Sequence, residues 1–239
     1  MPLRRPITSL PCKSNGAPVA DVIVKVTAMT WAHATFWHTE VQSLIDKHYQ
    51  HWQSNVPPQD VRADVGWDWT KILGLHAIHN FAIYIPGNHS GPALALALVV
   101  LTQSGEELPI GMLTVVPQFH CSVGNVVGSR TFAWYLADAP ISFYRDVLKV
   151  EPIVSVAAAL IDTAIQSGLD AGMNGSLLLH ADPNGGQRLA NYYLQRCKMQ
   201  QLPLNSPPVS PFRRKQVSQY FYMDAARAAA FSADFDCRR

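Results

Sequence analysis

Short apolar runs bounded by glycine or proline recur along the chain and predict β-strands. In residues 20–29 valine stands at every second position from Val22 to Val26, which is the period of a half-buried strand. Residues 93–101 and 109–117 are apolar runs with the length of buried strands, and proline or glycine stands beside each. The same criteria predict four more strands, at residues 81–85, 132–137, 176–182 and 218–224.

Segments with helical periodicity lie between these strands. Residues 35–52 place apolar side chains three and four positions apart, and residues 66–80 follow as a second, shorter helix. Residues 154–172 keep the same rhythm over a longer stretch and end at Gly172, which suits the C-terminal cap of a helix. A fourth helix is predicted at residues 186–198.

The order of these elements predicts a fold of the α/β class, more narrowly an α+β mixed sheet flanked by about four helices. Consecutive strands favour antiparallel pairing, and a helix between two strands favours a right-handed crossover with parallel pairing. Residues 20–224 are interpreted as a single domain. Residues 1–19 are aperiodic and are expected to form a loose leader, with residues 225–239 as a C-terminal tail.

Composition narrows the functional classes. Charged residues make up 15% of the 239 residues, below the roughly 25% of average soluble proteins, and hydrophobic residues make up 48%. This excess of hydrophobic over charged residues predicts an extensive core, or an apolar surface covered by a partner such as the second copy in a homodimer. The net charge of +2 and the lack of a basic run longer than residues 213–215 argue against nucleic acid as a partner.

The location expected from the sequence is the cytoplasm. The longest apolar run is far shorter than the about twenty residues that cross a bilayer, which argues against a membrane as a partner. The arginines near the start of the chain precede no apolar segment of the kind found in signal peptides. The four cysteines lie far apart without metal-binding spacing, as expected for thiols in a reducing compartment.

Three segments resemble the GCN5-related N-acetyltransferase (GNAT) superfamily, and the resemblance covers residues 20–224. Residues 148–152, LKVEP, look like the LxVxP that ends the central strand of that family. Residues 158–165, AALIDTAI, look like the long helix behind it, and residues 180–199, HADPNGGQRLANYYLQRCKM, look like the turn and helix that end in YxxxGF. A rival position for the central strand is TFAWYLADAP, residues 131–140.

This resemblance implies an acyltransferase that uses acetyl-CoA or another acyl-CoA as co-substrate. The acceptor would be a primary amine of a small molecule or a protein, and no metal is expected. In the family the pantetheine arm lies in a slot between two neighbouring strands, and the diphosphate meets the start of the long helix, where free N–H groups suit an anion. The residues that would then bind the coenzyme are Leu148, Val150, Ser155, Val156, Ala157 and Asn184.

The double tyrosine of the last predicted helix supplies the candidate general acid. A leaving thiolate needs a proton, and the phenol of Tyr193 can donate it. Tyr192 is the alternative. Counting back from Met199 places the tyrosine of the family pattern at Leu194, one residue after Tyr193.

Two residues are candidates for the general base that removes a proton from the attacking ammonium. Asp138 follows the predicted strand at residues 132–137, and His180 lies inside the apolar run at residues 176–182. A histidine on an apolar strand also has a structural explanation, as a hydrogen-bonded core residue.

A non-catalytic function is the main alternative. At the positions of the diphosphate loop of the family, Q/R-x-x-G-x-G/A, the chain reads PIVSVA. Pro152 stands in place of the basic residue, and Ser155 and Ala157 stand in place of the two glycines. These departures favour a relative that has lost coenzyme binding and serves in binding or assembly.

The histidines suggest a third, weaker alternative. His48 and His51, and likewise His76 and His79, stand three residues apart on predicted helices, so each pair shares a face. Four imidazoles brought together would bind zinc. Neither pair carries the glutamate of an HExxH hydrolase.

Overall fold

One mixed β-sheet organises the fold. The computed structural model describes residues 3–14, 17–49, 61–102, 104–203 and 219–239. In this part of the chain eight strands lie in the order β1-β2-β3-β4-β5-β6-β8-β7. Their bounds are β1 Ser9–Ser14, β2 Ala17–Ala28, β3 Leu94–Leu101, β4 Glu107–Val123, β5 Val126–Asp138, β6 Leu177–His180, β7 Gln200–Gln201 and β8 Tyr220–Met223. The α+β mixed sheet predicted from the sequence is confirmed.

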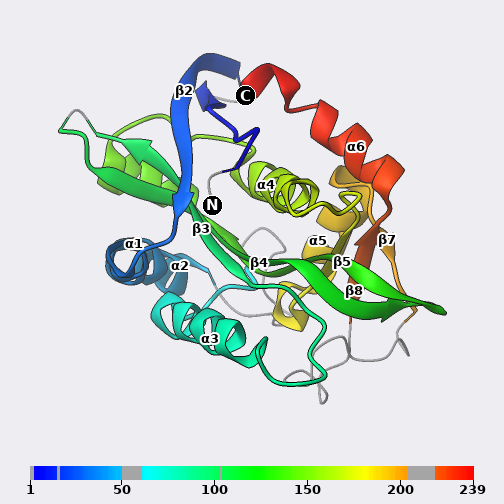
Figure 1. The fold of residues 1–239 in the computed structure, drawn as a ribbon. Helices are drawn as coiled ribbons and strands as arrows, with labels where there is room; N and C mark the ends of the chain where they lie inside the picture. Colours follow the sequence, from blue (N-terminus) through cyan, green and yellow to red (C-terminus); the bar gives the residue numbers. More distant parts are fainter. Residues whose placement is uncertain (1–2, 15–16, 50–60, 103, 204–218) are drawn as a thin grey trace.

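Helices cover both faces of the sheet. The α-helices of the described residues are α1 Trp31–Phe36, α2 Ser43–His48, α3 Trp69–Ala82, α4 Val156–Asp170, α5 Gly186–Asn191 and α6 Ala225–Ala233. Three π-helical turns accompany them: η1 Trp37–Gln42 between α1 and α2, η3 Phe143–Leu148, and η5 Tyr192–Arg196 at the end of α5. Figure 1 shows α1–α3 on one face of the sheet and α4 with α6 on the opposite face.

The strand pairing changes from antiparallel to parallel at β5. Strands β1 to β5 form an antiparallel series, in which each strand pairs with the next along the chain. The chain then passes through α4, and β6 pairs with β5 in parallel, while β8 and β7 close the sheet antiparallel. From β2 onward this is the succession that the GNAT resemblance implies: strand, helices, meander, long helix, strand, helix and a closing antiparallel pair.

Two predicted elements, one strand and one helix, differ in the structure. The strand predicted at residues 81–85 is wrong, because Phe81 and Ala82 complete α3 and the residues after them form turns. A short apolar run suits helix and strand equally well, and here the helix before it continues. The helix predicted at residues 35–52 is divided into α1, η1 and α2, and it begins earlier, where Thr30 caps α1. Residues 50–52 lie outside the described residues.

Both ends of the chain join the domain, which therefore extends beyond residues 20–224. Residues 9–14, expected in a loose leader, form β1, in which Leu10 is fully buried. Proline at the middle of this strand hides its alternating pattern in the sequence. Residues 225–239, expected to form a tail, fold into α6 and a short 3-10 turn and contribute the buried Ala228 to the core.

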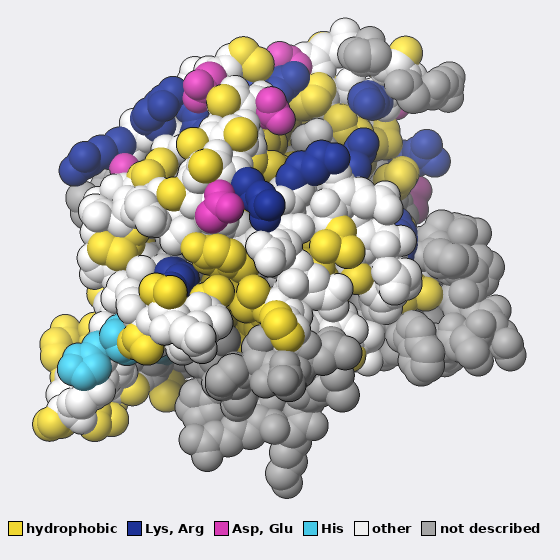
Figure 2. Space-filling view, turned by 90° about the vertical axis from the view of Figure 1, so that its right-hand side faces the viewer, with side chains coloured by type: hydrophobic (Ala, Val, Ile, Leu, Met, Phe, Trp, Pro, Cys, Tyr) yellow, Lys and Arg dark blue, Asp and Glu magenta, His cyan; other side chains and the backbone are white. Residues whose placement is uncertain are grey.

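The surplus of apolar residues is shared between core and surface. Most of the buried hydrophobic residues of both helical layers belong to one cluster. Large side chains such as Ile23, Phe81 and Tyr84 are nonetheless more than three-quarters exposed, at 76%, 77% and 83%. Figure 2 shows hydrophobic side chains between the lysines and arginines over one face of the molecule.

Helix α4 lies close against the sheet because two glycines leave room for it. A Cβ at Gly111 in β4 would come within 2.9 Å of the Cγ1 of Val156. A Cβ at Gly168 in α4 would come within 1.9 Å of the Oγ1 of Thr131, a fully buried residue of β5. The position of α4 over β4 and β5 is therefore fixed by close contact along its whole length.

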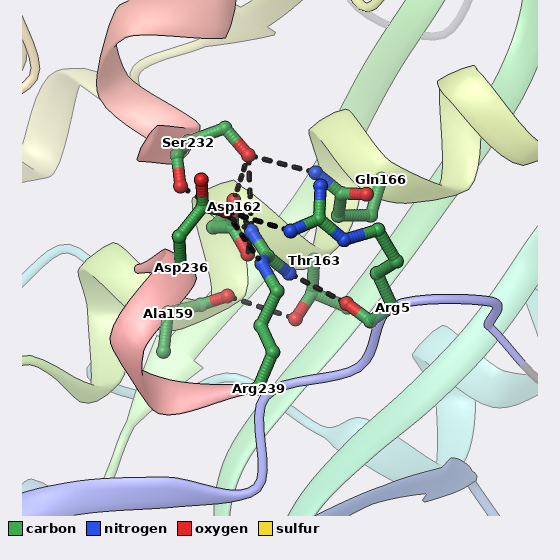
Figure 3. A network of polar contacts seen from close by, with 8 residues as sticks. All are labelled: Arg5, Ala159, Asp162, Thr163, Gln166, Ser232, Asp236 and Arg239. Carbon is green, nitrogen blue, oxygen red and sulfur yellow. Dashed lines mark hydrogen bonds and ion pairs between the residues drawn. The ribbon is translucent and has the colours of Figure 1, made fainter. Parts of the chain in front are cut away.

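A buried carboxylate ties α4 to the last residues of the chain (Figure 3). Asp162 is fully buried in α4, and its two oxygens accept hydrogen bonds from the Arg239 guanidinium at 2.8 and 2.9 Å. The hydroxyl of Ser232 in α6 donates to the same carboxylate at 2.6 Å and accepts from Gln166 at 2.7 Å. Burial raises the pKa of Asp162, and the bonds from Ser232 and Arg239 act in the opposite direction.

Two glycine substitutions inside helices test the packing of α4. Gly168→Ala should lower the free energy of unfolding by about 1–3 kcal/mol, because the stiff side chain of Thr131 must leave its position and its hydrogen bond to the Pro117 carbonyl. Gly74→Ala in α3, where a Cβ would meet no heavy atom within 4 Å, should raise it by about 0.5–1 kcal/mol. Urea denaturation measures both, and equal effects would rule out the close contact.

Removal of Arg239 should destabilise the protein strongly. Arg239→Ala is expected to lower the free energy of unfolding by about 3–5 kcal/mol, because it leaves the Asp162 carboxylate buried without its cation. Arg227→Ala is the matched control. Arg227 forms an exposed pair with Asp224, and its loss should cost less than about 1 kcal/mol in the same urea denaturation at pH 8.

The loss in Arg239→Ala should shrink as the pH falls. The pKa of Asp162 in the folded protein already lies above its ordinary value of 3.8, and Arg239 is one of the groups that hold it down. Without Arg239 the carboxyl of Asp162 in the folded protein therefore keeps its proton to a higher pH. The free energy of unfolding of the variant is then closest to that of the unchanged protein in acid, and it falls as the pH rises through the pKa of Asp162 in the folded state. An equal loss at pH 5 and pH 8 would argue against the pairing.

Candidate active site

The candidate site lies where β5 and β6 part. Their parallel pairing is confined to residues 131–133 of β5 and 177–179 of β6, although β5 continues to Asp138. A cavity of about 290 Å³ opens between the two strands beyond this short ladder. Its walls are the ends of β5 and β6, α5 with η5, the first turn of α4 and the segment before α3. This space is named the reaction cavity.

A β-bulge explains why the strands separate there. Thr114 of β4 pairs with Tyr135, whereas the next residue, Val115, pairs with Ala133, so Trp134 is an extra residue in β5. A bulge bends its strand and increases the local twist, which turns the end of β5 away from β6. Trp134 itself lines the reaction cavity.

The start of α4 borders the reaction cavity and is free of side-chain caps. Ser155 precedes the helix, is exposed and makes no capping hydrogen bond, and Ala157 in the first turn lines the cavity. The first N–H groups of a helix lack partners within the helix. A small residue in the wall and uncapped N–H groups beside it fit a phosphate group of a ligand.

The segment before α4 is held in place by β1. The N–H of Val154 donates to the carbonyl of Pro11 at 2.9 Å, and the N–H of Lys13 donates to the carbonyl of Pro152 at 3.1 Å. Ser155 then adopts a left-handed backbone with a φ of 67°, a conformation that favours glycine. For any residue other than glycine, serine included, this geometry costs about 1–3 kcal/mol, and such strain is often found at functional sites.

Both tyrosines that are candidates for the general acid, Tyr193 and Tyr192, line the reaction cavity. Tyr193 is 7% exposed, and its ring lies 5.2 Å from that of Phe221 and 5.7 Å from that of Tyr192. Burial raises the pKa of each tyrosine above its ordinary value, and the nearby Cys197 and Asp138 raise it further. Each phenol therefore stays protonated at neutral pH and acts as a hydrogen-bond donor.

Both tyrosines lie in a π-helical turn at the end of α5. The N–H of Cys197 donates to the carbonyl of Tyr192 at 3.1 Å, five residues back, which is the hydrogen bond of a π-helix. This turn holds one residue more than an α-helical turn. The YxxxGF pattern counts five positions from its tyrosine to its last residue, whereas six separate Tyr193 from Met199, and the extra residue lies in η5.

Asp138 belongs to a partly buried group of charges in the cavity wall, in which Asp64 is buried and the Asp138 side chain is 40% exposed. The guanidinium of Arg62 donates to the Asp64 carboxylate at 2.7 and 2.8 Å and to the Asp138 carboxylate at 3.1 Å. It also lies 5.4 Å from the centre of the Tyr49 ring. Burial lowers the pKa of Arg62, but the two carboxylates more than offset this, so the pKa lies above its ordinary value.

Arg62 and Asp64 were not predicted from the sequence. They stand two residues apart after a proline-containing stretch, and no pattern distinguishes this pair from other surface charges. Only their closeness to the aromatic segment GWDW, whose Trp67 lines the cavity, could have drawn attention to them.

His180, the second candidate base, is the last residue of β6. It is 7% exposed, its ring meets that of Tyr220 edge-on at 5.0 Å, and it lines the reaction cavity. The three residues predicted to be catalytic, Tyr193, Asp138 and His180, thus come from three elements and share one cavity.

The residues predicted to bind coenzyme are brought together only in part. Ala157 lines the reaction cavity, Ser155 precedes it, and Val156 is buried against Gly111. Asn184 lies in the 3-10 turn Pro183–Gly185 before α5, where its N–H donates to the Asp182 carboxylate at 3.0 Å. Asp182 and Gly185, two residues before it and one after it, line the cavity.

Leu148 and Val150 lie outside the central strand. Leu148 ends η3, and Val150 is 47% exposed after Lys149, which adopts a left-handed backbone. The central strand is instead β5, which contains the rival segment TFAWYLAD. Neither Leu148 nor Val150 is among the residues that line the reaction cavity.

The predicted histidine pairs are used in local contacts where the structure describes them. The Nε2 atoms of His76 and His79 lie 3.0 and 3.1 Å from the carbonyl oxygens of Ala93 and Gly91. His48 is exposed on α2, and residue 51 lies outside the described residues. No group of three or more histidine, cysteine, aspartate or glutamate side chains is arranged to hold a metal ion in the described part of the chain.

No helix among the described residues combines the length and the apolar character that crossing a membrane requires.

No family model matches the sequence, and no curated protein matches it.

Solved structures of acetyltransferases resemble the chain. An acetyltransferase of the GNAT family from Staphylococcus aureus Mu50 is 12% identical over 84% of this chain and 99% of its own, with a TM-score of 0.46. Spermidine N-acetyltransferase from Vibrio cholerae, in complex with CoA and spermine, is 11% identical over 86% and 98%, with a TM-score of 0.41. NAA60 from Arabidopsis thaliana, in complex with acetyl-CoA, is 14% identical over 83% and 96%, with a TM-score of 0.39.

The chain resembles GNAT acetyltransferases. At these identities and TM-scores the matches transfer no activity to this chain.

Proposed function

We propose that this protein transfers an acyl group from acyl-CoA to a primary amine of a small molecule or a protein. One observation carries the proposal: two parallel strands part beside the uncapped start of a buried helix, and the space between them is lined by a phenol, a carboxylate and an imidazole. A thioester donor, an amine acceptor and the proton transfers between them need these groups.

The donor would enter along the start of α4. Its diphosphate would accept hydrogen bonds from the first-turn N–H groups near Ser155 and Ala157. Its pantetheine arm would then lie between β5 and β6 beyond Ala133 and Leu179, the last residues of the two strands that still pair. Beyond this point β5 and β6 no longer pair with each other, so the amides of the arm would take the place of a neighbouring strand there.

The bulge at Trp134 would position the reacting carbonyl. The extra residue of a bulge lies outside the ladder, so its peptide groups are available to a ligand. An N–H donor aimed at the thioester oxygen stabilises the negative charge that develops there as the amine attacks.

The acceptor nitrogen forms the new C–N bond while the C–S bond breaks. Asp138 or His180 would take the proton that the amine loses, directly or through water. Arg62 acts as a positioning residue, because its bonds to Asp64 and to both the carbonyl and the carboxylate of Asp138 hold the end of β5 in place. Tyr193 would give a proton to the departing thiolate.

A non-catalytic binding protein is the second candidate function. The buried Pro152 supplies no cation to a diphosphate, and its carbonyl is engaged by β1. Against this alternative stands the backbone of Ser155, which keeps a left-handed geometry at the position of the glycine in the family pattern. Binding of the donor therefore decides between the two functions.

Acetyl-CoA should raise the melting temperature of the protein. The expected stabilisation is about 2.7 kcal/mol at a hundred times the dissociation constant. Ala157→Trp fills the wall beside α4 and should abolish the shift, whereas Val126→Trp, an exposed change at the far hairpin, should preserve it. No shift at millimolar acetyl-CoA or longer acyl-CoAs would remove the transferase proposal and leave the binding protein.

Tyr193→Phe should reduce kcat by about 10²-fold or more and leave acetyl-CoA affinity unchanged, because it removes only the proton donor. Tyr222→Phe, a change of the same kind on β8, is the control for loss of a phenol. Turnover measured by release of free thiol separates the two. A larger loss in Tyr192→Phe would assign the proton donor to Tyr192.

A further inference from the structure

A second cavity adjoins the reaction cavity on the α3 face of the sheet. It measures about 490 Å³ and lies between the last turns of α3, the segment that follows them, and strands β4 and β5. This volume falls within the roughly 300–1,000 Å³ of small-molecule sites. Nothing in the proposed proton transfers uses this space.

Trp134, the bulge residue, lines both cavities. Its ring meets that of His79 edge-on at 5.9 Å and stacks on that of Tyr135 at 5.8 Å. Tyr135 in turn meets Trp67, a residue of the reaction cavity, at 5.2 Å. Trp134 therefore stands at the border between the place proposed for the thioester and the second cavity.

The two cavities differ in charge. Arginine and aspartate side chains line the reaction cavity, whereas no aspartate, glutamate, lysine or arginine of the described residues lines the second cavity. Its apolar lining comes from both layers and includes Leu75, Ile78, Ala82, Val116, Phe119 and Phe132. Such a lining favours an uncharged apolar or aromatic group over a charged one.

The rim of the second cavity is unusually apolar for a protein surface. Ile78 and Ile85 line the cavity and are still 60% and 57% exposed, and Phe81 and Tyr84 beside them are more exposed again. A small ligand that enters here would remove part of this surface from water.

We propose that the second cavity binds the apolar body of the acceptor, an alkyl or arylalkyl group, while the amine of the same molecule lies past Trp134 in the reaction cavity. The identity of the reacting group rests on the proposed function. The donor would approach along α4, on one face of the sheet, and the second cavity opens on the other face. A nucleophile from that side can reach the thioester carbonyl without crossing the path of the coenzyme. The carboxylates of Asp64 and Asp138 complement the ammonium group before it loses its proton.

Two amines with the same head group test this inference. 2-Phenylethylamine should bind the protein without coenzyme about tenfold or more tightly than ethylamine, because its ring is removed from water. Isothermal titration gives both dissociation constants. Equal affinity for the two amines, or no measurable binding of either, would overturn the inference.

Two variants locate the binding. Ala82→Trp fills the second cavity from a half-buried position, and Ile85→Lys places a cation on its exposed rim. Each should cancel the tenfold preference for 2-phenylethylamine and leave the affinities for ethylamine and acetyl-CoA unchanged. If Ala82→Trp does not fold, Ile85→Lys alone tests the location of the ring. A preference for 2-phenylethylamine that survives in Ile85→Lys would place the ring outside the second cavity.

The outcomes separate this inference from the proposed function. If acetyl-CoA fails to bind but the preference for 2-phenylethylamine depends on Ile85, the transferase is wrong and the apolar site stands. If the variants instead weaken hexanoyl-CoA while acetyl-CoA and both amines bind as before, the second cavity takes the acyl chain, and the inference about the acceptor is wrong.

Discussion

The site depends on the short parallel ladder between β5 and β6. Three residue pairs hold the two strands together, and the bulge at Trp134 then turns β5 aside. Parallel strands that stayed paired to Asp138 would satisfy each other's main-chain groups and leave no room for a ligand. The same local irregularity thus lies beside the cavity and places an indole in its wall.

This opening is stable because the surrounding elements are fixed independently of it. Strand β1 holds the segment before α4, close contact at Gly111 and Gly168 holds the helix on the sheet, and Arg239 holds Asp162 from the opposite side. Arg62 performs the same task for the end of β5. The candidate catalytic groups therefore sit on elements whose positions are set before any ligand arrives, which limits the reorganisation that binding requires.

Patterns in the sequence were sufficient where burial alone determined structure. The period of α4 and the apolar runs of β3 and β6 follow directly from which residues must leave water, and they yield the mixed sheet. Asp138 and His180 are candidates because each follows or interrupts such a run, whereas Tyr193 is a candidate through the resemblance to the helix that ends in YxxxGF. The features that the sequence does not predict, such as the place of Arg62 in the site and strand β1, depend on contacts between distant segments. The bond from Arg62 to Asp138 spans 76 residues, and a proline obscures the alternation of β1.

The π-helical turn at η5 has a consequence for how relatives of this protein can be detected. Gain or loss of one residue in a helix turns everything beyond it by about 100°, which normally carries a side chain to a different face. Here the chain counts one position more between Tyr193 and Met199 than the YxxxGF pattern does, and a π-helical turn lies in that stretch. An alignment without a gap between them must misplace one of the two. Allowing a one-residue gap inside that helix is therefore a sensible condition for comparing other divergent chains with this one.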